Sequence, residues 1–598
     1  MSDQLLKSDF EPYSDARWLE AVDSALKGAA LDTLNSLEPG GMTRQPLYRE
    51  TDLEMADNNS GMPGLFPFMR GSSNAPTPYL PWHIAQRFVP NRKGSDNRAI
   101  LMDLAGGVSA VAIDLTNTAS FDHEQAQKLL SGVLLDIAPI SLMPGTHIHE
   151  AMDIMEGLWR DQKVTNTDCK AYLNADPIGT SAQNGKPQID LDLKHLFAWG
   201  AERENVTLLC ASGQMYHSAG ASEAQELGMI IATLVDYLRA AQKDDIAIEL
   251  LAQKTTLALS AETDFFATIA KIRAARLLWS QVFEQFGVKT IAPIVFAETS
   301  ERCFSTVDPW ANILRATIAT LAAGIGGANL ITVAPCTSVS EGDNDLTRRV
   351  ARNTHIILQE ESHIGKVMDP AGGAWYIEKL TRDLASQAWS IFQEIERQGG
   401  MAVALSSGYI EKLIAPIRVE RQDKVNLRNI AMIGVSEFPN LEEAPLKARA
   451  PKGEGPLSEK RLAVTIEQLR QIAEPSKPSV FLAAIGTPAR ATPRVNFAAN
   501  LYAISGVHGI AGQGGEDIGT IVSDFKKSGA KIACLCASDS DYETHALALA
   551  QGLLDAGATH IALAGKDRKI DGIDDYCFAG CDIITFATKI HNKLGLGV

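Results

Sequence analysis

Short runs of apolar residues alternate with amphipathic segments over residues 100–437, and this alternation is the dominant pattern of the chain. The apolar runs predict strands at residues 108–115, 137–143, 170–173, 207–211, 256–259, 291–296, 329–333 and 366–368. Between most of them lie segments with the 3.6-residue spacing of a helix, most clearly at 223–241 and 265–286. Because the runs are apolar throughout, they are typical of a parallel sheet buried on both faces. Eight strand–helix alternations favour a closed (β/α)8 barrel, that is, a TIM barrel.

A second set of alternations begins near residue 480, and it predicts a separate α/β domain. Apolar runs predict strands at 480–486, 531–537, 560–565 and 581–587, with helices at 495–505, 518–528 and 544–556. This order is typical of a small doubly wound, flavodoxin-like domain. The segment before it is rich in Pro, Gly and charge, so we interpret it as an exposed linker with a short helix at 462–472. The predicted organisation is an N-terminal arm (1–75), a barrel (76–437), a linker (438–478) and an α/β domain (479–598).

Composition narrows the class of protein. The 598 residues carry a formal net charge of −17, which argues against a nucleic-acid-binding face and against adhesion to anionic lipid. The first residues lack the basic and apolar pattern of a signal peptide, so we expect a cytoplasmic protein. The long uncharged run 316–340 is broken by glycines and Pro335, and it predicts helix, turn and strand rather than a membrane span. The eight cysteines predict buried reduced thiols, because Cys534 and Cys536 are too closely spaced for zinc ligands.

Residues 351–401 contain the most distinctive sequence motif of the chain, ARNTHIILQEESHIGKVMDPAGGAWYIEKLTRDLASQAWSIFQEIERQGGM. The DPAGG piece predicts a turn, with a short strand, between two helices. This stretch closely resembles the adenosylcobalamin-dependent acyl-CoA mutase family, methylmalonyl-CoA mutase above all. Residues 63–71 are similar to the family's Pro-Gly…Pro-Phe…Arg-Gly segment. The resemblance covers nearly the whole chain and implies a TIM barrel followed by a domain of the cobalamin-binding type.

The cobalamin-binding motif of the family is degenerate here. Family members that bind cobalamin carry Asp-x-His-x-x-Gly after the first strand of the C-terminal domain, and the His ligates cobalt. In this chain Pro488 stands at the Asp position, Arg490 at the His position and Pro493 at the Gly position. A guanidinium has no lone pair for cobalt. The resemblance therefore implies that this chain holds no cofactor and no metal. We interpret His508 and His545 as surface or packing residues, and the glycine-rich residues 509–515 as a flexible turn that does not join a strand to a helix.

The substrate residues of the family are replaced in the barrel. After the fourth predicted strand, Met215 stands where the family has a His that donates a hydrogen bond to the thioester carbonyl, which a thioether cannot do. His217, two positions on, leaves a titratable group nearby. Arg87 stands where a Tyr closes over the substrate. At the seventh predicted strand, the polar Gln-Ser-Leu-His-Thr-Asn becomes an apolar segment starting at Asn329, which suits a barrel filled by side chains.

These substitutions, beside an intact scaffold, imply a chain without a catalytic site of its own. The resemblance implies a heterodimer in which a large subunit carries substrate and adenosylcobalamin and converts (R)-methylmalonyl-CoA to succinyl-CoA. This chain would be the non-catalytic half, with its N-terminal arm wrapped around the partner. Two alternatives remain at this stage. One is a competent mutase for another acyl-CoA that uses His217 and an atypical cobalamin mode. The other is a free-standing interaction partner of the mutase.

Overall fold

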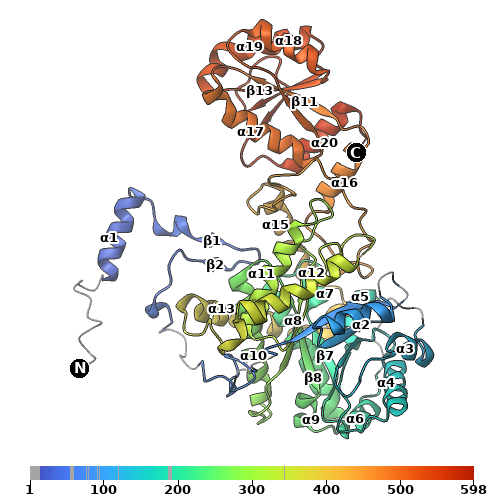
Figure 1. The fold of residues 1–598 in the computed structure, drawn as a ribbon. Coiled ribbons are helices and arrows are strands. Elements are labelled where there is room, and N and C mark those ends of the chain that lie inside the picture. Colours follow the sequence, from blue (N-terminus) through green and yellow to red (C-terminus); the bar gives the residue numbers. More distant parts are fainter. Residues whose placement is uncertain are drawn as a thin grey trace.

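The computed structural model shows a barrel, a smaller α/β domain above it and an arm that extends from the barrel's side (Figure 1). It describes residues 14–53, 60–75, 77, 80–90, 92, 95–116, 118, 120–185, 191–342 and 344–597. Residues 1–13, where the sequence lacks a signal-peptide pattern, lie outside this set. Both predicted domain types are confirmed.

Eight parallel strands close the barrel, in the order β10-β3-β4-β5-β6-β7-β8-β9. Their bounds are β3 His83–Phe88, β4 Ala110–Asp114, β5 Ile140–Met143, β6 Ala171–Ala175, β7 Val206–Ser212, β8 Thr255–Ala261, β9 Ile294–Thr299 and β10 Leu330–Thr332. Seven of the predicted strands are confirmed with shifted ends. The eighth prediction, 366–368, was wrong: a 3-10 turn at Ile364–Lys366 leads into an extended, exposed Val367. The missed strand is β3, so the segment before Met215 is the fifth barrel strand and not the fourth.

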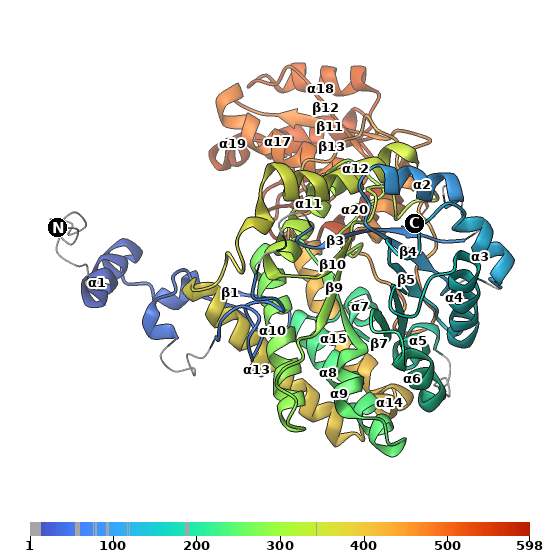
Figure 2. The same cartoon turned by 60° about the horizontal axis from the view of Figure 1, so that its bottom comes forward.

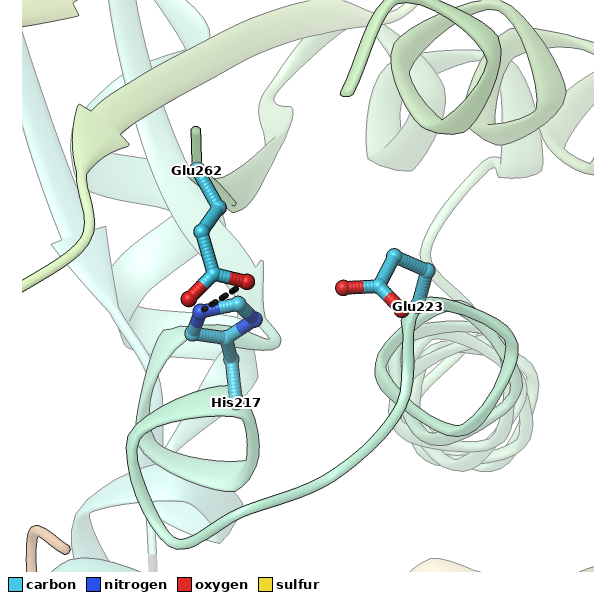
Figure 3. A group of neighbouring side chains, drawn as sticks. All are labelled: His217, Glu223 and Glu262. Atoms are coloured by element: carbon cyan, nitrogen blue, oxygen red, sulfur yellow. Dashed lines mark ion pairs between the residues drawn. The ribbon is translucent and has the colours of Figure 1, made fainter. Parts of the chain in front are cut away.

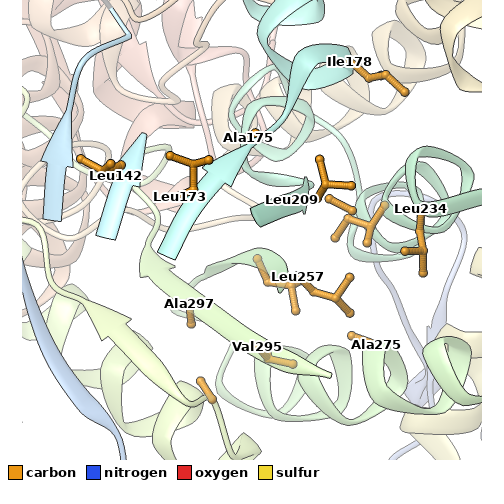
Figure 4. Close-up of a cluster of buried hydrophobic side chains, with 14 of the residues drawn as sticks. Leu142, Leu173, Ala175, Ile178, Leu209, Leu234, Leu257, Ala275, Val295 and Ala297 are labelled. Carbon is orange, nitrogen blue, oxygen red and sulfur yellow. The ribbon is translucent and has the colours of Figure 1, made fainter. Parts of the chain in front are cut away.

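Helices surround the barrel and bury its outer face (Figure 2). Their bounds are α2 Asn97–Ala105, α3 His123–Leu129, α4 Ile148–Gln162, α5 Pro177–Asn184, α6 Leu193–Ala201, α7 Gln214–Ser218, α8 Glu223–Lys243, α9 Ile248–Gln253, α10 Phe265–Glu284, α11 Ala311–Gly326, α12 Asp345–Ile356, α13 Trp375–Arg397, α14 Met401–Ser406 and α15 Tyr409–Asn426. The predicted helices at 223–241 and 265–286 are α8 and α10. Alternate strand residues such as Leu173, Leu209 and Leu257 point outwards into a core shared with these helices (Figure 4). This core accounts for most of the hydrophobic stabilisation.

Two of the segments that resemble the family, residues 63–71 and 351–401, contact each other in the structure. Asp369, in the turn before α13, is almost fully buried, and one of its oxygens accepts a hydrogen bond from Arg70 Nε at 2.9 Å. The other pairs with Arg273 of α10, whose second guanidinium nitrogen lies 2.5 Å from Glu378. The Asp-Pro-Ala-Gly-Gly turn therefore fastens the end of the arm to the barrel. The structure has no strand in this turn, contrary to the prediction.

The C-terminal domain is a five-stranded parallel sheet in the order β12-β11-β13-β14-β15, the 2-1-3-4-5 order of flavodoxin-like domains. Its strands are β11 Ser479–Ala484, β12 His508–Ala511, β13 Ile532–Cys536, β14 His560–Ala564 and β15 Asp575–Cys577. Its helices are α17 Pro488–Ile504, α18 Ile518–Ser528, α19 Asp539–Asp555 and α20 Ile583–Leu594. Residues 581–587, predicted as a strand, open α20, where Asp582 caps the helix by accepting from Thr585 N. The glycine-rich residues 509–515 do join a strand, β12, to a helix, α18, which corrects the interpretation from sequence.

The two domains share one hydrophobic cluster at their junction. Val307, Val425 and Met432 of the barrel side pack with Leu501 and Phe586 of the C-terminal domain. The predicted short helix is confirmed as α16 (Val464–Ala473), and its buried Arg470 donates to the carbonyl oxygens of Ile504, Gly434 and Val435. The two domains are therefore packed against each other.

The N-terminal arm begins with α1 (Asp15–Leu26), followed by a 3-10 turn at Leu31–Leu34 and a short hairpin of β1 (Ser36–Leu37) and β2 (Thr43–Arg44). A second 3-10 turn follows at Glu50–Asp52. No residue of α1 is buried, and the helix lies well apart from the barrel in both views (Figures 1 and 2). Among the described residues, no helix is long and apolar enough to cross a membrane.

Candidate functional site

A cavity of about 540 Å³ lies at the carboxyl ends of the barrel strands. This is the end of a TIM barrel at which active sites are built, because the loops after the strands converge there. Its walls carry many polar groups from different strands, including Asp114, Ser141, Asn174, Ser212, Ser260, Glu298 and Thr332. The filled barrel expected from sequence is confined to the floor, where Tyr172 and Phe296 meet edge to face at 4.9 Å among small buried residues.

The charges in this mouth are largely paired with one another. Arg87, from β3, forms an ion pair with Glu298 of β9 and lies 3.5 Å from Asp114 of β4. Burial raises the pKa of Glu298, and Arg87 opposes that rise. Glu301, just beyond β9, pairs with Arg449 at 2.8 Å and with Lys452. Carboxylates outnumber cations around the mouth, so it is a poor site for an anion.

Residues 446–462, which we call the strap, run across the mouth. The strap is hydrogen-bonded to loops and short helices that follow several strands: Leu446 N to Thr306 O, Arg449 N to Val339 O, Glu454 N to Gln183 O, Lys460 N to Ser218 O and Leu462 N to Arg302 O, at 2.8–3.0 Å. Its Arg449 also binds Glu459 through two hydrogen bonds, and Leu457 is buried. The predicted exposed linker is therefore, in this part, a cover over the barrel.

Removing the Glu301 carboxylate is expected to loosen the strap. In Glu301→Gln, Arg449 and Lys452 lose the charge that holds them at the mouth, while Arg449 keeps Glu459. We expect amide hydrogen exchange at the strap's hydrogen-bonded N–H groups to rise about tenfold, equivalent to about 1.4 kcal/mol of local opening. Glu284→Gln, at an exposed ion pair that does not contact the strap, is the matched control. Unchanged exchange in Glu301→Gln would show that backbone hydrogen bonds alone hold the strap.

Asp176 is a buried acid of the mouth, and it has no cationic partner within 4.0 Å among the described residues. It caps α5, and its carboxylate accepts from Tyr237 Oη at 2.6 Å, from Gly179 N at 2.8 Å and from Ser212 N at 3.3 Å. Burial raises its pKa to about 6, and these three hydrogen bonds oppose the rise. Asp176 therefore takes up a proton more readily in the folded than in the unfolded chain.

This raised pKa predicts a pH dependence of stability. The contribution of protonated Asp176 is full below the unfolded value of 3.8 and is lost as pH rises through about 6. At neutral pH, holding Asp176 ionised in its buried position lowers the free energy of unfolding by about 3 kcal/mol. We expect Asp176→Asn, which keeps an acceptor oxygen, to gain stability relative to wild type between pH 4 and 7 in thermal unfolding. The exposed cap variant Asp122→Asn should show no such gain; an equal response of both variants would contradict the assignment.

The structure brings together two of the degenerate barrel positions and separates the third. Arg87 and Met215 both line the mouth. Asn329 lies at the opposite end of the barrel, just before β10, where it accepts from Val295 N and donates to Ser72 Oγ. It thus serves the floor and not the mouth. Asp176 and the strap were missed by sequence reasoning: the Asp176-Pro177 pair signals a helix start, but nothing in it reveals the cavity.

The crevice where a flavodoxin-like domain binds ligands lies at the carboxyl ends of β11 and β13. Here α17 begins at Pro488, separated from β11 by residues 485–487, so Arg490 and Pro493 are helical rather than parts of a loop. Arg490 reaches across the crevice to Ser538 Oγ and Ser540 Oγ, and it lies 3.2 Å from Asp541. These residues do not fit cobalamin, because a cation that donates to its neighbours occupies the position of the imidazole.

Neither His508 nor His545 takes that place. His508 starts β12 at the amino end of the sheet, opposite the edge of Arg490, and His545 lies inside α19. Neither is positioned to replace the missing ligand. Both placements agree with the sequence interpretation of these two residues.

His217 belongs to a buried ion network behind the mouth (Figure 3). Its Nε2 lies 2.9 Å from Ser300 Oγ, and its Nδ1 lies 3.2 Å from Glu226 Oε2. Burial, assisted by Arg302 and Lys271, holds the pKa of His217 well below its usual value. His217 is fully buried and does not line the cavity that holds Met215.

The spacing of His217, Glu223 and Glu262 would suit a metal ion, because their ligand atoms lie within 4.8 Å of one another. Arg302, however, forms an ion pair with Glu262 and lies 3.6 Å from Glu223. Lys271 lies 2.6 Å from the neighbouring Glu226. These cations already neutralise the carboxylates and would repel a metal. We therefore assign the group as a structural ion network.

A TIM barrel with a polar mouth, followed by a flavodoxin-like domain, defines the architectural class expected from the sequence resemblance. A sequence model of the methylmalonyl-CoA mutase family matches residues 38–506. The chain is 36% identical to the methylmalonyl-CoA mutase small subunit of Streptomyces virginiae, over 99% of this chain and 98% of that one. It is 31% identical to the small subunit of Propionibacterium freudenreichii subsp. shermanii, over 99% and 96%. It is 26% identical to the methylmalonyl-CoA mutase of Cereibacter sphaeroides, over 72% and 65%.

The chain belongs to the methylmalonyl-CoA mutase family. This confirms the resemblance seen in the sequence.

Proposed function

We propose that this chain is the small subunit of a heterodimeric methylmalonyl-CoA mutase, which interconverts (R)-methylmalonyl-CoA and succinyl-CoA. The observation that carries the proposal is the pattern of relatives: proteins named as small subunits match over nearly the full length of both chains. The mutase of Cereibacter sphaeroides, which is not named as a subunit, matches a smaller share of each chain. The large subunit would supply substrate binding and adenosylcobalamin.

The absence of catalysis by this chain is part of the proposal, and three features support it. Arg490 cannot ligate cobalt and is engaged with Ser538 and Ser540. Met215 cannot donate a hydrogen bond to a thioester. The mouth is covered by the strap and is rich in carboxylates, which disfavours the phosphates and carboxylate of an acyl-CoA.

The role left for the chain is to bind and rigidify its partner. The arm offers an amphipathic helix with no buried residue, and Leu19, Leu34 and Leu37 along it are exposed. Exposed apolar side chains on an extended arm are typical of a segment that folds against another chain. Radical chemistry in the large subunit requires exclusion of water, and a tightly held partner limits how far that subunit opens. We place this assembly in the cytoplasm, in keeping with free thiols at all eight cysteines.

Expression of the large subunit with and without this chain tests the proposal. We expect the large subunit alone to lose most of its activity or its thermal stability, and co-expression to restore both. The arm variant Leu19→Asp/Leu37→Asp should weaken the heterodimer, whereas the exposed C-terminal variant Leu547→Asp should leave it intact. A large subunit that is fully active and stable alone would refute the supporting role. Turnover by this chain alone would favour the competent-mutase alternative.

A further inference from the structure

A second cavity, of about 420 Å³, lies outside the barrel at the root of the arm. The hairpin formed by β1 and β2 covers one side of it, and the amino ends of α8 and α10 form another. The remaining walls come from α11, α15 and residues 430–433. This cavity shares no lining residue with the barrel mouth, and the ion network that contains Glu262 and Arg302 lies between them.

Two arginines of this cavity have no carboxylate partner within 4.0 Å among the described residues. Arg421, on α15, is 6% exposed, and its guanidinium donates only to the carbonyl oxygens of Gly220 and Ala221, at 2.7 and 3.4 Å. Arg315, on α11, donates to Asn312 Oδ1 at 2.7 Å and to the carbonyl oxygen of Ile433 at 2.6 Å. A guanidinium has five N–H donors, so both retain capacity to bind an anion.

Burying the charged guanidinium groups of Arg315 and Arg421 without a carboxylate partner costs free energy, because the charges lose contact with water. Burial, followed by the neighbouring charge of Arg302, lowers the pKa of Arg421 to about 10, although nearby carboxylates oppose this shift. Burial also lowers the pKa of Arg315. Arg276 is likewise bonded to carbonyl oxygens, but it is fully buried and lines neither this cavity nor the barrel mouth. Arg421 and Arg315 differ because a cavity lies beside them.

The cavity wall carries four cations, Arg44, Arg302, Arg315 and Arg421, and four carboxylates, Glu38, Glu223, Glu262 and Asp264. Each of these carboxylates lies within 4.0 Å of Arg44 or Arg302, which leaves Arg315 and Arg421 without an ion pair among the described residues. Burial, with Arg302 and Lys271, holds the pKa of His217 far below its usual value, which keeps it neutral. At the rim, Arg44 pairs with Asp264 and lies 3.5 Å from Glu38, where these side chains remain in part open to solvent. Asp308 and Glu420 lie further from the two arginines, and Glu420 is paired with Lys424.

The rest of the cavity wall is apolar. Met42, Ala267, Cys303, Leu314 and Leu462 contribute carbon and sulfur surface, and Leu314 is 71% exposed at the rim. An apolar wall beside two guanidinium groups that form no ion pair within 4.0 Å among the described residues suits a ligand with an anionic head and a short aliphatic chain. Inorganic phosphate would leave the apolar wall without a partner.

We propose that this cavity binds a small aliphatic carboxylate, with its carboxylate at Arg315 and Arg421 and its chain against Leu314 and Leu462. The carboxylate of the ligand would accept charge-assisted hydrogen bonds from the remaining N–H groups of the two arginines. The site goes beyond the proposed small-subunit function, because it requires neither the large subunit nor the barrel mouth.

Calorimetric titration of the full-length chain with hexanoate tests the proposal, with uncharged hexanamide as the matched ligand. We expect hexanoate to bind at one site and hexanamide to bind at least tenfold more weakly. Arg315→Gln should weaken hexanoate at least tenfold. Leu314→Glu places a carboxylate at the exposed rim and should weaken it similarly without disturbing the fold. Arg98→Gln, at an exposed surface pair, is the control expected to bind normally.

Several outcomes would overturn the proposal. One is the absence of hexanoate binding, and another is equal binding of hexanoate and hexanamide. A third is unchanged affinity in folded Arg315→Gln and Leu314→Glu. If hexanoate binds the isolated chain but is displaced when the large subunit is added, the occupant is a carboxylate of that partner. Because the titration uses this chain alone, its failure leaves the heterodimer proposal untouched.

Discussion

Purified chain that has been incubated with adenosylcobalamin and then desalted is expected to remain colourless. The reason is geometric as well as chemical: Arg490 offers no lone pair and donates to Ser538 and Ser540 instead. In addition, α17 starts at Pro488, so only residues 485–487 remain as a loop after β11. A visible absorption spectrum measures the retained cobalamin directly, and we expect less than a tenth of an equivalent.

A cobalamin-binding large subunit carried through the same steps should turn pink and is the control for the procedure. Stoichiometric colour on this chain would contradict the expectation. Variants of His508, His545 and His217 would then identify the residue responsible, beginning with His217 because it lies beside the mouth. That result would revive the competent-mutase alternative.

The second large effect is expected at the buried ion network. Lys271 and Glu226 are both fully buried, and Glu226 also accepts from Ser260 N at 2.7 Å. Lys271→Met leaves the Glu226 carboxylate without its cation, and we expect the barrel to lose about 3–5 kcal/mol of unfolding free energy. Denaturant unfolding monitored by tryptophan fluorescence would measure the loss.

The double variant Glu226→Gln/Lys271→Met provides the matched comparison. Gln keeps an acceptor for Ser260 N and removes the unpaired charge, so the double variant should be more stable than Lys271→Met alone. The exposed pair variant Lys289→Met should change stability by less than about 1 kcal/mol. If Lys271→Met falls in that same small range, the network contributes far less than its burial implies.

The elements that the sequence predicts well are those whose residue pattern is dictated by burial. The apolar barrel strands and the long helices α8 and α10 fall into this class. β3 was missed because its inward-facing residues include His83 and Arg87, which interrupt the apolar pattern at the polar mouth and floor. The apolar residues of 581–587 lie at the start of helix α20, and a short apolar run does not distinguish strand from helix.

The site was harder to predict, because a motif in the sequence tells which residue is replaced but does not tell where that residue lies in the folded barrel. Met215 and Arg87 meet at the mouth, whereas Asn329 belongs to the floor, and only barrel closure determines this. The strap was mistaken for an exposed linker because its Pro, Gly and charges are typical of one. Its Arg449 is paired with Glu459, which is near in sequence, and with Glu301, which is distant in sequence.

The strap also determines where this chain could be divided into self-sufficient pieces. A barrel cut at the sequence-predicted boundary of residue 437 would lose its cover and leave Glu301 without either cation. The strap would then remain attached only to the C-terminal domain, and its Leu457, which is buried in the intact chain, would be exposed to solvent. The shortest barrel that keeps its own mouth closed therefore ends near residue 462, well inside what composition alone marks as the connection between domains.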